Sequence, residues 1–477
     1  MMNNDHKTMR RAGTLTALAA ALLLGGCMSF IPKYERPAAP VAPAYAPELL
    51  AAGAGSGTVA AADIEWQRFF TDARLRRLIE LSLANNRDLR VAVLNIEAAR
   101  AAYQVKRADE LPSVGAGFTA QRAAGSTGGL VNTYAVGLQV TGYELDFFGR
   151  VRSLSQSALS QYLATEEARK TTQITLVASV ANTYVGLLAD EELLRVTRET
   201  LKTRDESFRL TKLKFDNGAA SELDFRQAEQ LLEGARATLA QTQRQRALDE
   251  NALVLLVGQP LPADLPPVGV LANQQVSTDL PAGLPSELLT RRPDVRSAEQ
   301  QLLAANANIG AARAAFFPRI SLTANAGTAS TELGNLFKSG TFALTGSATL
   351  LQPIFDAGRN QANLDVAKVN KDIAIAQYEK AIQTAFREVS DSLAGRATLG
   401  EQLRAQAAQT NAAQVSFNLA DLRYRNGAAS YLDVLDAQRS LFTAQQALVQ
   451  VQALQAQNLM TLYKVLGGGW TEPTQAN

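Results

Sequence analysis

Cysteine and histidine, the side chains most often used as nucleophiles, general bases and metal ligands, are almost absent from this sequence. The 477 residues contain one of each, Cys27 and His6. A lone thiol can be acylated, but it cannot form a disulfide within the chain or a Cys–His catalytic pair. What remains is the chemistry of carboxylates and guanidinium groups. One short stretch spaces such groups regularly, with Leu432, Asp436 and Arg439 at i, i+4 and i+7, and therefore on one face of a helix.

The N-terminal residues have the pattern of a bacterial export signal. Basic residues precede an apolar stretch from about Leu15 to Leu24, which is too short to cross a bilayer. Leu24-Gly25-Gly26-Cys27 follows and resembles the lipobox of bacterial lipoproteins. By that resemblance, residues 1–26 are removed as a signal peptide, Cys27 carries a covalent lipid, and Met28, in place of aspartate, favours the outer membrane. The alternative is an ordinary secretory signal with an incidental cysteine.

Charge and composition exclude several function classes for the mature chain 27–477. Removing residues 1–26 takes away three basic residues, one acidic residue and His6, which leaves 44 charges of each sign. A net charge of zero gives no strong field for nucleic acid. Without imidazole or a free thiol, metal sites and catalytic triads based on these groups are excluded. We expect no enzyme activity, no metal and no cofactor other than the lipid on Cys27.

The chain contains an internal duplication. Residues 149–258 and 358–467 align without a gap at a constant offset of 209, and a weaker match at offset 206 precedes each copy. A repeat identifies the structural unit. The expected organisation of the mature chain follows from it: an extended segment 28–62, a first half 63–258, a proline-rich linker 259–285, a second half 286–467 and a tail 468–477.

Each repeat unit predicts a long helical hairpin. All 16 prolines lie outside the two units, and a proline costs roughly 3 kcal/mol inside a helix. Apolar residues recur at a seven-residue spacing, as in a coiled-coil seam; in the first unit these are Val180, Leu187, Leu194, Leu201, Phe208 and Phe215. A helix of about 65 residues, roughly 100 Å long, cannot bury all its apolar surface in a single copy, so it must pack laterally in an assembly.

The hairpin turns have recognisable capping residues. Gly218 and Gly427, preceded by Asn217 and Asn426, suit left-handed C-caps. The serines three residues after each glycine suit the N-cap of the returning helix, with an aspartate three residues further on in a capping box; these residues are Ser221, Asp224, Ser430 and Asp433.

Four segments alternate apolar and polar residues as strands do. They lie near residues 113–124, 133–145, 319–329 and 341–352. Each has about the length of a tilted membrane strand, although a soluble four-stranded sheet is the alternative. Four strands cannot close a barrel in lipid, where an open sheet edge is not tolerated. If the strands span a membrane, several copies must therefore associate.

Several motifs, distributed over the whole mature chain, together resemble one family. They are Pro32-Lys33-Tyr34-Glu35-Arg36-Pro37, Trp66 with Phe69-Phe70, Asn85-Asn86-Arg87-Asp88-Leu89, Tyr143-Glu144-Leu145-Asp146-Phe147-Phe148-Gly149-Arg150, Arg291-Arg292-Pro293-Asp294, Ala311-Ala312-Arg313-Ala314-Ala315-Phe316-Phe317-Pro318 and Asp433-Val434-Leu435-Asp436-Ala437-Gln438-Arg439. This set resembles the outer-membrane factor family of the TolC/OprM type, and within it the lipidated, OprM-like NodT subfamily of multidrug efflux channels.

The resemblance implies a mainly α fold with a transmembrane β-barrel. Four strands per chain would give a 12-stranded barrel in a homotrimer, and the antiparallel hairpins would form an α-barrel in the periplasm. It implies outer-membrane lipid around the barrel, a periplasmic adaptor (membrane fusion) protein and an inner-membrane RND transporter as partners, and exported drugs or small molecules as cargo.

The resemblance also assigns roles to residues of the two turns. The tip, with Asn217, Gly218, Asn426 and Gly427, would contact the adaptor. The gate would comprise Leu432, Asp436 and Arg439, with Asp433 close by and Tyr424 on the opposing arm. Asp433 is already explained as a capping-box acid, and Tyr424 as seam packing. Asp436 and Arg439 have no capping role and correspond to Gln227 and Gln230 in the first repeat, which favours function over a solvated helical ion pair.

Two other functions remain open at this stage. The outer-membrane duct of a type I secretion system would have the same fold. A structural periplasmic coiled-coil lipoprotein would explain the heptads and Cys27, but not the four alternating strands.

Overall fold

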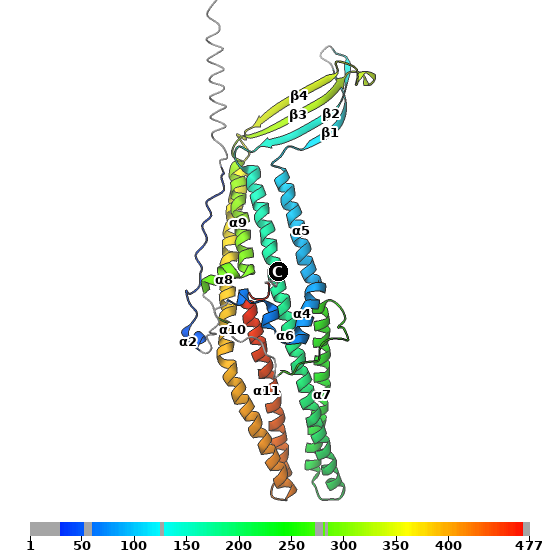
Figure 1. Cartoon of the computed structure of the whole chain (residues 1–477), viewed down its shortest axis with the longest axis vertical. Helices are drawn as coiled ribbons and strands as arrows, with labels where there is room; N and C mark the ends of the chain where they lie inside the picture. Colours follow the sequence, from blue (N-terminus) through cyan, green and yellow to red (C-terminus); the bar gives the residue numbers. More distant parts are fainter. Residues whose placement is uncertain (1–28, 52–59, 125–127, 272–279, 282–284, 471–477) are drawn as a thin grey trace, which may run out of the picture. The chain divides into compact units, whose positions relative to one another are not determined.

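A computed structural model describes residues 29–51, 60–124, 128–271, 280–281 and 285–470 (Figure 1). The predicted signal peptide, Cys27 and residues 471–477 lie outside this part. The chain divides into two compact units. The first, here called the sheet unit, comprises Met1–Ala38, Asn95–Glu166 and Ser297–Glu379; the second, the hairpin unit, comprises Ala39–Leu94, Glu167–Arg296 and Lys380–Asn477. Each unit takes segments from both repeats, so the predicted halves 63–258 and 286–467 are not separate compact bodies.

The two repeats give the same succession of elements: a helix, two strands and two long helices. The first has α5 Arg87–Ala108, β1 Val114–Ala124, β2 Leu130–Leu145, α6 Arg150–Asp216 and α7 Glu222–Val257; the second has α9 Pro293–Ala314, β3 Arg319–Ser330, β4 Phe342–Leu351, α10 Arg359–Arg425 and α11 Tyr431–Val465. Shorter helices are α2 Pro47–Ala51, α3 Trp66–Phe69, α4 Ala73–Asn85 and α8 Pro285–Arg291, with 3-10 turns at Ala61–Asp63 and Leu333–Asn335. The segment 28–62, predicted to be extended, contains α2 and is therefore partly helical.

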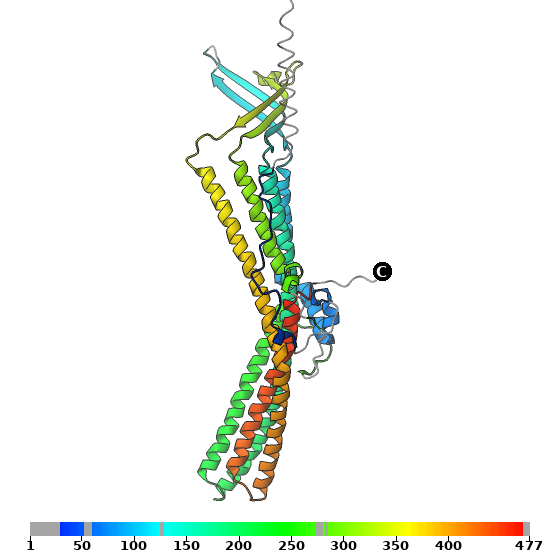
Figure 2. The same cartoon turned by 90° about the vertical axis from the view of Figure 1, so that its left-hand side faces the viewer.

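The helical hairpins turn as their sequences predict. Gly218 and Gly427 have φ angles of +70° and +71°, in the left-handed region. Both returning helices begin with complete capping boxes, Ser221 with Asp224 and Ser430 with Asp433. Within the hairpin unit, α6, α7, α10 and α11 run side by side and both turns lie at the same end (Figures 1 and 2).

The heptad seam forms the interior of the hairpin unit and loosens towards the turns. Val180 and Leu194 on α6 are fully buried, whereas Phe208 and Phe215 are only half-buried. A stretch of α6 is apolar enough to pass for a membrane-spanning helix, but 67 % of that window is buried within the protein. Such burial is typical of a helix packed in a bundle.

At the ends of the hairpins away from the turns, the duplication reappears as repeated contacts. The Asn86 amide donates to the Leu256 carbonyl at 2.9 Å, and in the second repeat the Arg292 guanidinium donates to the Val465 carbonyl at 3.1 Å. The donors are related by the offset of 206 and the acceptors by the offset of 209. The weaker sequence match therefore marks residues that fold back onto the stronger one.

Gly258, which ends α7 with φ +78°, lies against backbone at this place. A Cβ atom there would stand 2.5 Å from the Asn85 carbonyl oxygen, whereas a Cβ at Gly218 would meet open space. We expect Gly258→Ala to lower the free energy of unfolding by about 2–4 kcal/mol, because left-handed strain and a backbone clash add, and Gly218→Ala by only about 1 kcal/mol. Thermal unfolding of the two variants measures the difference, and equal losses would contradict this account.

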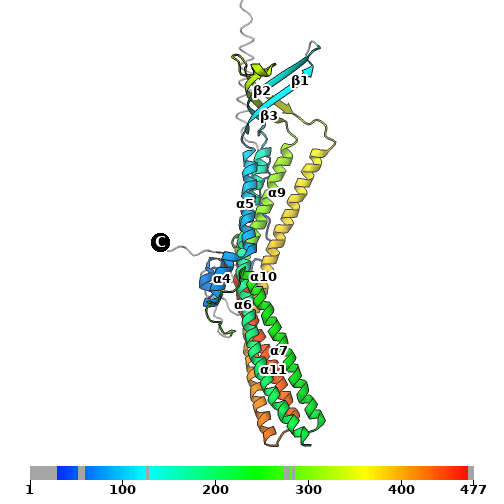
Figure 3. The ribbon, with the colours of Figure 1, turned by 90° about the vertical axis from the view of Figure 1, so that its right-hand side faces the viewer.

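The four strands form one antiparallel sheet in the order β1-β2-β3-β4 (Figure 1), which Figure 3 shows from another side. The register places large apolar residues of all four strands on one face, including Phe118, Leu138, Leu322, Leu344 and Leu350. The other face carries small and polar residues such as Asn325 and Thr345, which are paired across β3 and β4.

No other layer of the described chain covers the apolar face. Phe118 is 57 % exposed, Phe342 71 % and Leu344 73 %. In a soluble sheet, this face would pack on a core. The exposed face therefore argues against the soluble alternative and favours strands that contact lipid.

Glycines on the opposite face let two strands approach closely. Gly137 and Gly327 are directly paired, with Gly117 beside Gly137 on β1. A Cβ atom on Gly137 would lie 2.5 Å from the Ala326 carbonyl oxygen. Glycine at such a row permits sharp sheet curvature, with the small-residue face on the concave side.

The segment after the predicted lipidation site is fastened to the sheet unit. Arg36 makes a bidentate ion pair with Glu299 at 2.8 and 2.9 Å, and the Tyr34 hydroxyl donates to the same carboxylate. The Phe30 ring stacks on Phe317 with centroids 4.6 Å apart. Gly310 provides room, because a Cβ atom there would lie 2.6 Å from Ile31. The attachment to α9 explains why these residues are ordered without helix or strand.

Candidate gate and docking tip

The two hairpin turns present the same backbone structure to solvent. In each, the glycine N–H donates to the carbonyl three residues back, and the following alanine N–H donates to the carbonyl five residues back, from Ala219 to Lys214 and from Ala428 to Arg423. The side chains of Asn217 and Asn426 donate to Leu213 and Leu422 at 2.7 Å. The asparagines thus satisfy helix carbonyls, and both exposed turns are closed by backbone hydrogen bonds.

The three predicted gate residues lie in the first turns of α11. Asp436 and Arg439 form an ion pair at 3.3 Å with side chains 59 % and 57 % exposed. Leu432, one turn earlier, is also exposed. Because the pair lies within one helix, it does not tie the two hairpins together. It places a carboxylate and a guanidinium on the same exposed face of α11.

The other two residues of the predicted gate have packing partners. Asp433 accepts from the Ser430 N–H in the capping box, so its structural role is established by its geometry. The Tyr424 ring packs on Tyr431 with centroids 5.3 Å apart, and its hydroxyl accepts from the Lys214 ammonium at 2.8 Å. Lys214 belongs to α6, so this contact joins the two hairpins near their turns.

The sequence did not predict two residues that hold the hairpins together. Besides Lys214, Gln438 joins α11 to α6 by donating to the Ser207 hydroxyl at 3.3 Å. A lysine or a glutamine is common in helices, so neither residue is conspicuous in the sequence.

Within the described residues, no group of three or more His, Cys, Asp or Glu side chains could hold a metal ion.

Further along the hairpin unit, α6 and α7 bring two carboxyl groups together. Asp190 is 6 % exposed, and burial, followed by the charge and hydrogen bond of Asp249, raises its pKa from 3.8 to about 7. Glu191 raises the pKa further, and Arg246, which is paired with Glu191 and Glu250, lowers it. Asp190 is therefore expected to keep its proton in mildly acidic solution.

This pair should make stability depend on pH. The folded protein holds a proton on Asp190 that the unfolded chain releases near 3.8, so the free energy of unfolding falls as pH rises from about 4 to about 7 and levels off above it. Asp190→Asn should remove this slope and stabilise the protein at pH 8 by on the order of 2 kcal/mol. Thermal unfolding midpoints between pH 4 and 8 test this prediction, and parallel curves for wild type and variant would contradict a raised pKa of Asp190.

A bundle of capped helical hairpins and a curved sheet with an uncovered apolar face define a class of protein: membrane channels that combine a helical barrel with a strand barrel. The family model for outer membrane efflux proteins matches residues 78–259 and 284–468. The protein belongs to the outer membrane efflux protein family, as the resemblance implied.

Individual relatives agree over almost the whole chain. The probable efflux pump outer membrane protein TtgC of Pseudomonas putida is 50 % identical, covering 97 % of both chains, and the outer membrane protein OprJ of Pseudomonas aeruginosa is 44 % identical, covering 96 % of both. Among solved structures, the open state of the Neisseria gonorrhoeae MtrE outer membrane channel is 41 % identical with a TM-score of 0.85, covering 94 % of this chain and all of that one.

Proposed function

We propose that this protein is the outer-membrane channel of a tripartite RND-type multidrug efflux pump, a passive duct with no reaction of its own. The observation that carries the proposal is the uncovered apolar face of the sheet, which needs lipid around it, joined in one chain to helical hairpins with hydrophilic turns. A purely structural periplasmic lipoprotein would have no use for such a sheet. The relatives named as efflux pump components support the same assignment.

The working form is a homotrimer. β1 and β4 each have one edge without a partner strand in the described chain, and three copies would pair these edges into a closed barrel of 12 strands. Large apolar side chains near the turns, which one copy leaves exposed, would be covered in the same assembly; they are Leu210, Leu213, Leu223, Val415, Leu419 and Leu422.

The partners are a periplasmic adaptor and an inner-membrane RND transporter. The adaptor would dock on the turns at Asn217-Gly218 and Asn426-Gly427, whose hydrogen-bonded backbone offers a surface at one end of the hairpin unit. The transporter would select and drive the drugs or small molecules, since the duct has no energy source.

Reconstitution tests the proposal directly. Purified full-length protein should form trimers and give single-channel currents in planar bilayers. A protein that remains monomeric in detergent and gives no conductance would refute the channel, and with it the pump assignment.

Cys27 is proposed to carry the lipid that anchors the segment held on α9. We expect Cys27→Ser to abolish incorporation of labelled palmitate while part of the protein stays in the outer membrane, because the strands hold it there independently. Ser29→Ala serves as a matched control. Unchanged labelling in the Cys27 variant would show that the signal is an ordinary secretory one.

A further inference from the structure

One guanidinium group lies inside the hairpin unit without a carboxylate partner. Arg204, on α6, is only 5 % exposed, and no carboxylate of the described residues forms an ion pair with it. It donates one hydrogen bond, from Nη1 to the Leu231 carbonyl at 3.0 Å, and lies 5.0 Å from the centre of the Phe442 ring. Its buried Nε donor has no partner.

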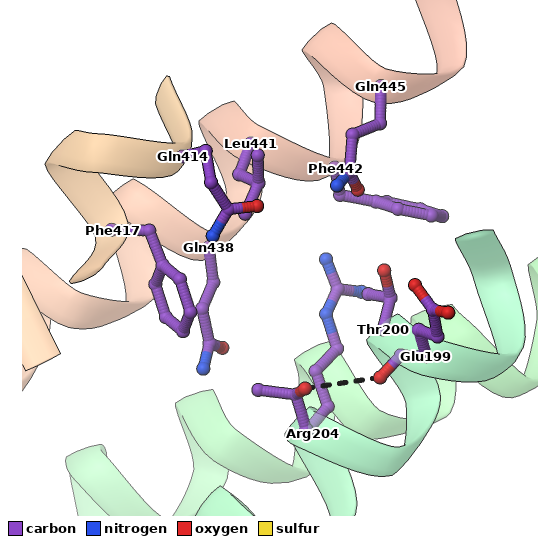
Figure 4. Close-up of a pocket in the computed structure, with 10 residues that line it drawn as sticks. Glu199, Thr200, Arg204, Gln414, Phe417, Gln438, Leu441, Phe442 and Gln445 are labelled. Carbon is purple, nitrogen blue, oxygen red and sulfur yellow. Dashed lines mark hydrogen bonds between the residues drawn. The ribbon is translucent and has the colours of Figure 1, made fainter. Parts of the chain in front are cut away.

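Arg204 points into a pocket between α6, α10 and α11, below the ring of Phe442 (Figure 4). The pocket has a volume of about 140 Å³ and includes Gln438, whose buried Oε1 atom also has no partner. The unpaired Arg204 Nε–H suggests that an acceptor is missing from the pocket, because buried polar groups in proteins are nearly always hydrogen-bonded. The Gln438 Oε1 is itself an acceptor and would take a donor such as water.

No carboxylate in the described part of the chain compensates the charge of Arg204. Burial lowers the pKa of the guanidinium, and so does the positive charge of Arg439, with no acidic group acting in the other direction. Arginine nevertheless stays protonated in proteins, so the side chain remains a buried cation. The Phe442 ring offsets part of the cost of burying this cation, and a negative charge would offset the rest.

Of the two repeats, only the first has an arginine at this position. The residue equivalent to Arg204 in the second repeat is Ala413, although the helices around it are duplicated. The fold therefore does not require a cation at this position, and the arginine calls for another explanation.

We propose that the pocket binds a small monovalent anion of the halide type, such as chloride, beside the guanidinium of Arg204, whose Nε–H has no partner. The guanidinium lies over the Phe442 ring, so the anion would approach the edge of the guanidinium and not the side that the ring covers. The pocket is small, and its remaining walls include the apolar side chains of Phe417 and Leu441. Glu199 also lines it and pairs with Arg195 at 2.8 Å. Its charge opposes any anion, and it opposes a doubly charged phosphate or sulfate more strongly than a halide. One guanidinium can neutralise one charge, which matches a halide.

The site would influence the tip, because its residues come from both hairpins. Arg204 belongs to α6, whereas Phe442 and Gln438 belong to α11, the helix that carries Asp436 and Arg439. Arg204 and Arg439 repel each other, and a bound anion beside Arg204 would reduce that repulsion. The anion would hold the two hairpins together.

Two measurements on the full-length protein test the proposal. In crystals grown with sodium bromide, the anomalous signal should show a peak beside Arg204 in the wild type and none in Arg204→Met. In solution, the thermal unfolding midpoint of the wild type should rise and saturate as chloride replaces gluconate at constant ionic strength, as mass action requires for a ligand that binds only the folded state. Arg204→Met should lose this response. Arg209→Met is the matched control, because Arg209 lies on the same helix in an exposed pair with Asp205.

A second variant covers the case in which Arg204→Met does not fold. Glu199→Gln removes the like charge and should lower the half-saturating chloride concentration roughly threefold. A pocket that contains only water in bromide crystals would overturn the proposal. So would a carboxylate of a neighbouring copy in that place, or chloride responses that are the same in all variants.

Discussion

Replacing Asp436 and Arg439 with alanine should raise the conductance of the isolated channel severalfold, and more so together with Leu432→Ala. In the proposed trimer, three copies of this face meet at the axis, and the two half-exposed charged groups can contact their neighbours. Three exposed carboxylate–guanidinium contacts of about 0.5 kcal/mol each amount to roughly 1.5 kcal/mol, which changes the ratio of open to closed states about tenfold. Planar-bilayer recordings measure the change, and uptake of vancomycin by cells reports it in vivo.

The first repeat supplies the matched control for this experiment. Gln227 and Gln230 occupy the equivalent positions on α7, and their replacement by alanine should leave conductance unchanged. Tyr424→Phe removes the hydrogen bond from Lys214 between the hairpins and should act in the same direction as the gate variants, but less strongly. If the gate variants form normal trimers and conduct like wild type, the constriction lies elsewhere.

Leu344→Arg should prevent stable insertion, whereas Thr345→Arg, one residue away, should be tolerated. Leu344 lies on the apolar face of β4, and an arginine that contacts the middle of a bilayer costs about 2–4 kcal/mol per strand. The effect is multiplied in an assembly of several copies. Thr345 faces the small-residue side, which in a closed barrel lines the water-filled interior.

Two properties distinguish the variants: retention in the membrane during extraction, and heat-resistant trimers on gels. If Leu344→Arg loses both properties and Thr345→Arg keeps both, the faces of the sheet are assigned. The reverse result would mean that the sheet curves the other way and that its apolar face is turned inward.

The helices and their turns could be predicted because the determinants are local. Ser221 with Asp224 is a capping box in the sequence before any fold is known, and the glycines with positive φ follow asparagines in both repeats. The alternation of apolar residues likewise located the strands. It could not reveal which strands are neighbours, because a period of two defines faces and not edges.

Contacts between helices were beyond local reasoning. The hydrogen bond from Lys214 to Tyr424 depends on the register of two helices far apart in the chain, and no periodicity specifies it. The burial of Arg204 likewise depends on how helices far apart in the chain pack together. A comparison of the repeats could have found this residue, since Ala413 in the second copy shows that the position tolerates a small apolar side chain.

The two open edges of the sheet have a consequence in cells that contain more than one version of the protein. A single chain cannot satisfy the backbone groups of β1 and β4 in lipid, so insertion and association must happen as one event. One copy with a defective edge strand then prevents closure of every barrel that contains it. With equal synthesis of intact and defective chains, only roughly one eighth of the proposed trimers would be wholly intact. Such a mutation should therefore be genetically dominant, even though the damaged chain lacks any activity of its own.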